Sequence, residues 1–256
     1  MLGIWTSELE RNWKRKSKIV LYAAFLVLVI LNILGASSSG MGEFRFGEGS
    51  ITLNTLNAPW FVMNGISLLM VAALLPIIYI DHLSGELHSG GYRIYGLRPY
   101  RRFELWLGKI LALAVTTLIF ILVTYGIAMI GSKIFFPSTD TTTLYRTEGE
   151  VGRVSAEWYT VKFYAVFLLT CLAKLLFCSA ICVFISRPLI AFLVVSALSV
   201  VIYHYLATEL VFLFDPFQQI LLALRPEGSY KFWIYLIGSM VVFGSISLVG
   251  WQKKVI

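Results

Sequence analysis

Hydrophobic residues in this chain gather in six long runs separated by polar stretches. The runs cover residues 19–34, 59–80, 103–130, 158–185, 188–207 and 230–250. A helix rises 1.5 Å per residue, so about 20 residues cross a hydrocarbon core of about 30 Å. Only the first run looks short, and it can extend back through Ser17 and Lys18, because a lysine stem reaches the headgroups. The pattern predicts an all-α membrane protein with six transmembrane helices, forming one domain over residues 1–256.

An amphipathic stretch precedes the first run. Ile4, Trp5, Leu9 and Trp13 recur at helical spacing, with charged residues on the other faces. Tryptophan and basic residues anchor such helices at a membrane surface. We predict an interfacial helix over residues 1–16 on the inner leaflet; a soluble tail is the alternative, and it leaves both tryptophans exposed.

The segment 208–229 is apolar but broken in the middle by Asp215-Pro216. Asp215 can cap a helix that has Pro216 at its first position. The two resulting limbs are too short to span a membrane. We predict a re-entrant hairpin on the outer side, with an interfacial helix as the equally good alternative. The apolar stripe of the second limb comprises Phe217, Ile220, Leu221 and Leu224.

Of the other two outer connections, the first is predicted to be irregular and the second to be a solvated connector. Residues 35–58 are rich in Gly, Ser and Asn, and residues 131–157 contain Pro137 and a threonine run at 141–143. Such composition is typical of solvated loops. We expect no folded domain in either.

Composition and charge agree with a membrane protein and set its orientation. Apolar residues make up 58% of the chain and charged residues 14%, with a net charge of +7. Because Lys and Arg accumulate on the cytoplasmic side, we predict an N-in, C-in layout and take the net charge as a topology signal, with no nucleic-acid partner. The residues placed inside are Arg11, Lys14, Arg15, Lys16, Lys18, Arg93, Arg98, Arg101, Arg102, Lys109, Arg187, Lys253 and Lys254.

The chain lacks the usual signs of an enzyme. It has no Gly-x-x-x-x-Gly-Lys-Ser/Thr phosphate loop, and Asp81, Glu104 and Glu209 lie only at span ends. His82 and His88 flank Glu86 in a pattern too weak for a metal site, and we expect them on a polar surface. We predict a non-catalytic protein that binds no metal or cofactor directly. The cysteines share one helical face and are expected to pack as small apolar residues: Cys171, Cys178 and Cys182.

Lys174 is the exception, since it lies near the centre of the fourth run. A cation at that depth costs on the order of 2.5 to 3.5 kcal/mol. We predict that Lys174 faces a permeation path or a subunit contact, with Glu209 or His204 as its partner. The alternatives are that Lys174 snorkels or meets backbone carbonyls, and that His204 is structural.

A basic, glycine-rich island lies between the second and third runs, at residues 81–109. It resembles the corresponding loop of ABC-2 type ABC transporter permeases, in which a glutamate and a glycine precede a short cytoplasmic helix. In that family a Pro-x-x-Arg then leads, seven residues on, to the lysine of a Gly-Lys pair. Arg102 to Lys109 reproduces this spacing, whereas Tyr92 and Arg101 stand where the family often has small or hydroxyl residues. The matching order is Glu86, Gly90, Gly91, Leu97, Pro99, Arg102, Gly108 and Lys109.

The resemblance implies a permease subunit of an ATP-driven exporter in the plasma membrane of a bacterial cell. It implies a second permease chain, identical or different, and two separate ATPase subunits that bind ATP and magnesium. The implied substrate is amphipathic or hydrophobic, such as a peptide, lipid or drug. The loop 81–102 would hold the coupling helix; for its arginines, contact with lipid headgroups is the simpler alternative. The residues expected to meet the ATPases are Glu86, Gly90, Gly91, Arg93, Arg98, Pro99, Arg101 and Arg102.

Two rival classes stay open. An ATPase-independent secondary transporter or channel, or an intramembrane enzyme, would need ionisable groups inside the spans, where Lys174 and His204 are a thin set. A structural assembly or immunity factor is the other class. Only the exporter predicts a stoichiometric partner that carries a phosphate-loop motif.

Overall fold

The computed structural model describes residues 2–44, 50–88, 102–145, 149–206, 208–225 and 230–254. Six helices in these ranges are long and apolar enough to cross a membrane, so the prediction of six spans is confirmed. The first has 22 residues and is not short; the fifth, with 18, is the shortest of the six. The chain is therefore a multi-pass membrane protein. The spans are Lys18–Ser39, Ala58–Gly85, Phe103–Phe135, Arg153–Phe184, Pro188–Tyr205 and Tyr230–Lys253.

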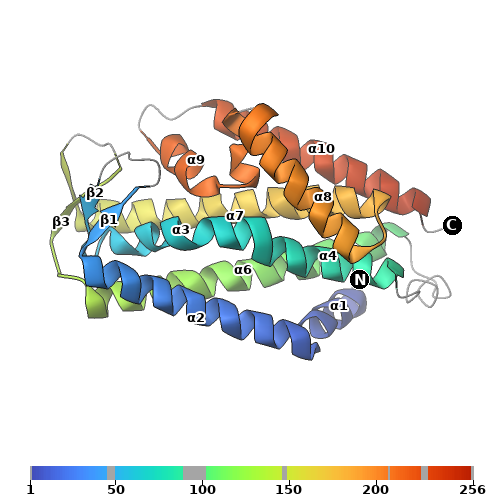
Figure 1. Cartoon of the computed structure of the whole chain (residues 1–256), viewed down its shortest axis with the longest axis horizontal. Helices are drawn as coiled ribbons and strands as arrows, with labels where there is room; N and C mark the ends of the chain where they lie inside the picture. The colour runs from blue at the N-terminus through green and yellow to red at the C-terminus, as the bar shows by residue number, and fades with distance from the viewer. Residues whose placement is uncertain are drawn as a thin grey trace.

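The helices form a bundle around α7 (Figure 1). Helix α7 contacts α4, α6, α8, α9 and α10 and has the most buried span, whereas only a small part of the spans in α2, α8 and α10 is buried. We call the end of the bundle that carries α1 and the C-terminal end of α10 the termini end. The opposite end, which carries the four short β-strands, is the hairpin end. The helices are α1 (Leu2–Lys14), α2 (Lys16–Ser39), α3 (Ala58–Leu69), α4 (Leu75–His88), α6 (Arg102–Phe135), α7 (Arg153–Phe184), α8 (Pro188–Val201), α9 (Pro216–Ala223) and α10 (Tyr230–Lys254).

The second span is one helix interrupted by a π-helical turn, η2 (Met70–Leu74), between α3 and α4. Pro76 lies just beyond this turn and has no N–H to donate to the carbonyl of Ala72. A π turn is a usual way for a helix to accommodate such a break. The fifth span ends similarly, because α8 continues into the π-helical η3 (Ile202–Leu206).

The expectation of an irregular first outer connection is wrong, and the second is more than a solvated connector, because each contains a pair of short antiparallel strands. Strand β1 (Met41–Glu43) pairs with β2 (Ser50–Thr52), and β3 (Thr141–Thr143) pairs with β4 (Glu150–Gly152). The threonine run suits a strand, since alternate side chains point to opposite faces: Thr142 is buried and its neighbours are exposed. Its Oγ accepts a hydrogen bond of 2.9 Å from Asn54 Nδ2. In the part of the chain that the structure describes, the fold is helical with two small sheets at the hairpin end.

The broken segment before the last span forms two short limbs, as predicted. The first is a 3₁₀ helix, η4 (Thr208–Leu213), and the second is α9, which has Pro216 at its first position. Asp215 occupies the N-cap position without a side-chain capping bond. The buried Phe217 of α9 packs against Trp60, Phe61 and Phe163, which anchors this segment near the hairpin end (Figure 1).

Helix α10 meets α7 closely at Gly250. A methyl group there would overlap the branched side chain of Val183, which has little rotameric freedom. We expect Gly250→Ala to lower the free energy of unfolding by about 1–3 kcal/mol. Gly238, on the same helix, has open space around it, so Gly238→Ala is the matched control and should be neutral or stabilising by up to about 1 kcal/mol. Thermal unfolding in detergent measures both; equal stability of the two variants would contradict this packing.

Candidate functional site

The structure describes the two ends of the basic island, residues 81–88 in α4 and 102–109 in α6, but not the residues between them. Glu86 lies in the last turn of α4 and Arg102 begins α6, and their side chains are outside the described part of the chain. The remaining predicted coupling residues lie wholly outside the described residues. They are Gly90, Gly91, Arg93, Arg98, Pro99 and Arg101.

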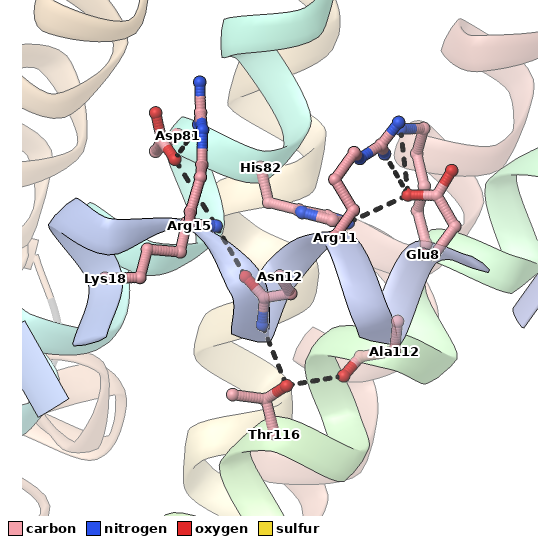
Figure 2. A network of polar contacts seen from close by, with 10 residues as sticks. Glu8, Arg11, Asn12, Arg15, Lys18, Asp81, His82, Ala112 and Thr116 are labelled. Carbon is pink, nitrogen blue, oxygen red and sulfur yellow. Dashed lines mark hydrogen bonds and ion pairs between the residues drawn. The ribbon is translucent and has the colours of Figure 1, made fainter. Parts of the chain in front are cut away.

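A buried carboxylate at the termini end brings three helices together (Figure 2). Glu8 of α1 has its Oε2 atom 3.1 Å from Nε2 of His82 on α4 and 3.5 Å from Nζ of Lys109 on α6. Arg11, one turn along α1, pairs with the same oxygen. His82 Nε2 is within ion-pair distance but is not aligned for a hydrogen bond. Glu8, His82 and Lys109 are each at most 3% exposed, so the contacts are shielded from solvent.

The surroundings of Glu8 keep it ionised. Burial raises its pKa, but the contact with His82 and the charge of Lys109 together outweigh that effect and lower the pKa from 4.5 to about 2. A buried charge is tolerated when it is paired. At neutral pH Glu8 is therefore an anion held among α1, α4 and α6.

A second set of contacts extends this network to α2 (Figure 2). Lys18 Nζ donates to Asn12 Oδ1 at 2.5 Å, and Asn12 Nδ2 donates to Thr116 Oγ1 at 2.9 Å. Thr116 donates in turn to the backbone carbonyl of Ala112. The amide of Asn12 thus links α1 to both α2 and α6.

Asp81 of α4 completes the network at its partly exposed edge. Its Oδ2 atom lies 2.6 Å from Nη1 of Arg15, between α1 and α2, and 3.3 Å from Nζ of Lys18. Buried and half-exposed charges therefore tie α1 and α2 to the helix that enters the island and to the helix that leaves it. We call the set the base network: Glu8, Arg11, Asn12, Arg15, Lys18, Asp81, His82, Lys109 and Thr116.

The contacts between the residues of this network were not predicted from the sequence. A helix, α1 (Leu2–Lys14), lies within the predicted stretch 1–16, and its face that carries Glu8 and Asn12 is buried and packs against α6. Its placement at a membrane surface stays a prediction. The i, i+4 spacing of these two polar residues was a signal that one face of α1 meets a polar surface. His82 was expected on a polar surface, and the structure buries it.

Lys174 forms a separate buried site in the middle of α7. Its Nζ donates to Ser199 Oγ of α8 at 2.7 Å and to the backbone carbonyl of Leu213 in η4 at 2.8 Å, and it lies 5.3 Å from the centroid of Phe177. The ammonium meets a backbone carbonyl, which was one of the alternatives. His204 is exposed, and the side chain of Glu209 lies outside the described residues. The role of Lys174 in a path or a subunit contact stays a prediction.

The cysteines and the metal-ligating residues add no further site in the described ranges. Cys171, Cys178 and Cys182 are free, buried thiols within α7. No three His, Cys, Asp or Glu side chains of the described residues come together in a group that could hold a metal ion.

The fold and the base network define a multi-pass helical membrane protein. Ion pairs and hydrogen bonds join its helix α1 to α4 and α6, the two helices on either side of the basic island. Comparison of the sequence with known protein families and with characterised proteins finds no match.

Proposed function

We propose that this chain is the transmembrane permease subunit of an ATP-driven exporter of the ABC-2 type. The order of residues from Glu86 to Lys109 supports the class. The single structural observation that carries the proposal is the burial of Lys109, the last residue of that order, against Glu8 of α1. A force on the loop would pass through this contact into α1 as well as into α4 and α6.

In this proposal the part of the predicted stretch 81–102 that joins α4 to α6 faces the cytoplasm and holds a coupling helix that docks on an ATPase subunit. ATP and magnesium bind to the ATPase, and this chain performs no chemistry. When two ATPase subunits close on ATP, the loop is displaced. Because α4 and α6 are covalently continuous with it, they move as levers. The base network makes α1 and α2 follow, so four helices respond to one docking event.

The remaining parts of the proposal are a dimeric assembly and an apolar cargo. Helices α2, α8 and α10 present rows of exposed apolar side chains, which suit lipid or a second permease chain in the plasma membrane. The limbs η4 and α9 would form the re-entrant hairpin on the outer side. The cargo class is an amphipathic or hydrophobic molecule, such as a peptide, lipid or drug.

Affinity purification from native membranes tests this function. We expect a stoichiometric partner with a phosphate-loop motif, which an ATPase-independent transporter would not retain. The double variant Glu86→Ala with Arg102→Ala should recover about tenfold less ATPase, equivalent to about 1.4 kcal/mol of binding free energy. The matched control is Arg153→Ala with Glu157→Ala, which removes an exposed Arg–Glu pair on α7. Purification without such a partner, or equal recovery from both double variants, would refute the proposal.

A further inference from the structure

A polar cavity opens at the hairpin end, between the start of α3, the last turns of α6 and the start of α7. Its volume is about 430 Å³, which lies within the usual size of a small-molecule site, roughly 300–1,000 Å³. Leu56, Pro59 and Thr160 are buried and form its floor. A hydrogen bond of 3.1 Å from the backbone N–H of Thr55 to the carbonyl of Pro137 holds the two bordering loops together.

The rim of this cavity carries charges of both signs. Arg153 and Glu157 pair with each other, with Arg153 Nε 3.0 Å from Glu157 Oε1. Lys133 of α6 and Asp140 of the following loop also line it, and neither makes an ion pair or hydrogen bond with any described residue. Within the described part of the chain, the cavity therefore offers one free ammonium and one free carboxylate beside a neutral ion pair. That arrangement complements a ligand that carries one charge of each sign.

We propose that this cavity binds the headgroup of a phosphoethanolamine lipid, with Asp140 receiving the primary ammonium and Lys133, assisted by Arg153, receiving the phosphate diester. Both contacts are charge-assisted hydrogen bonds. A primary ammonium fits better than a quaternary one, because proteins hold quaternary ammonium groups in aromatic cages and no aromatic side chain lines the described cavity.

A neighbouring apolar groove favours a lipid over a free headgroup. It lies between α2 and α6, has a volume of about 190 Å³, and is lined by Ile30, Ile33, Ile127, Ile130 and Ile134. Ile134 follows Lys133 directly, so the groove and the cavity occupy faces of α6 about 100° apart at the same level. From there the groove extends along α6 to Ile127, over about 10 Å at 1.5 Å per residue. An acyl chain can occupy it while the headgroup reaches Lys133.

Lipid retention by the purified full chain tests the proposal, whether or not the chain is an exporter subunit. Native mass spectrometry in detergent would be run with phosphatidylethanolamine, phosphatidylcholine and phosphatidylglycerol. We expect phosphatidylethanolamine to be retained best, and Lys133→Ala and Asp140→Ala each to weaken retention about tenfold. Lys162→Ala, at an exposed lysine elsewhere on α7, is the control and should leave retention unchanged.

Two further measurements distinguish binding of the whole lipid from binding of the headgroup alone. Ile130→Trp fills the apolar groove and should weaken retention of phosphatidylethanolamine, with the unfolding temperature in lipid-free detergent confirming that each variant is folded. Soluble glycerophosphoethanolamine should not compete for the site at millimolar concentration. Effective competition by this soluble compound, equal retention of the three lipids, or unchanged retention by the Lys133 and Asp140 variants would overturn the proposal.

Discussion

Glu8→Ala is expected to lower the free energy of unfolding by about 3 kcal/mol. The variant removes the carboxylate that His82 and Lys109 share inside the protein, and breaking a buried ion pair from one side typically costs about 3–5 kcal/mol. The depressed pKa gives a similar figure, because a fall from 4.5 to about 2 corresponds to roughly 3 kcal/mol in favour of the ionised folded state. Both arguments rest on the same contacts and assign Glu8 an effect far larger than that of a surface charge.

Glu10 provides the matched control on the same helix. Its carboxylate pairs with Lys14 on an exposed surface, with more than half of each side chain accessible to water. Water and salt screen such an exposed pair, so it contributes little to stability. Glu10→Ala should therefore hardly change the unfolding temperature in detergent, while Glu8→Ala lowers it clearly. Similar unfolding temperatures for the two variants would show that the base network does not stabilise the fold.

The same carboxylate gives the stability a defined pH dependence. The pKa of Glu8 is lower in the folded protein than in the unfolded chain, so its contribution is fully present above about pH 4.5 and is lost as the pH falls towards about 2. The amide side chain of Glu8→Gln cannot be protonated in this range. In this variant the free energy of unfolding should therefore change less between about pH 4.5 and 2 than it does in the wild type. If the free energy of unfolding of the variant fell with pH as steeply as that of the wild type, the acid sensitivity would come from other groups.

Lys174→Met is expected to loosen the segment that connects the fifth and sixth spans. The substitution keeps the length of the side chain but removes the ammonium that donates to Ser199 and to the carbonyl of Leu213. A buried carbonyl left without a donor costs about 1–3 kcal/mol. Leu213 is the last residue of η4, so losing the hydrogen bond should destabilise this limb before the rest of the bundle.

Hydrogen exchange measures this effect locally. The backbone N–H groups of Phe214 and Asp215 both donate to the carbonyl of Val211, next to the Lys174 contact. They should exchange faster in Lys174→Met, and to a smaller extent in Ser199→Ala, which removes one acceptor only. Lys162→Met, at an exposed position on the same helix, should leave them unchanged. Unaltered protection in Lys174→Met would mean that the ammonium does not hold η4 in place.

Features that rest on short stretches of chain could be predicted well. The six spans follow from runs of about 20 apolar residues, and the start of α9 follows from Asp215-Pro216, because both depend on local backbone chemistry. The hairpins were missed because short strands need partners. The pairing of Thr142 with Val151, and its bond to Asn54, join segments that a reading of local composition treats as separate loops.

The sequence by itself determined that this is a six-span membrane protein with a basic island between the second and third spans, since the hydrophobic effect and charge asymmetry act on each segment alone. The tertiary structure decided what the polar residues do. Asn12 and Thr116 are 104 residues apart, and Lys174 and the Leu213 carbonyl are 39 apart. Glu8 likewise becomes a shared anion only when α4 and α6 bring His82 and Lys109 beside it. Such contacts form because buried charges and carbonyls need partners, and only the packing of the helices shows which groups are within reach.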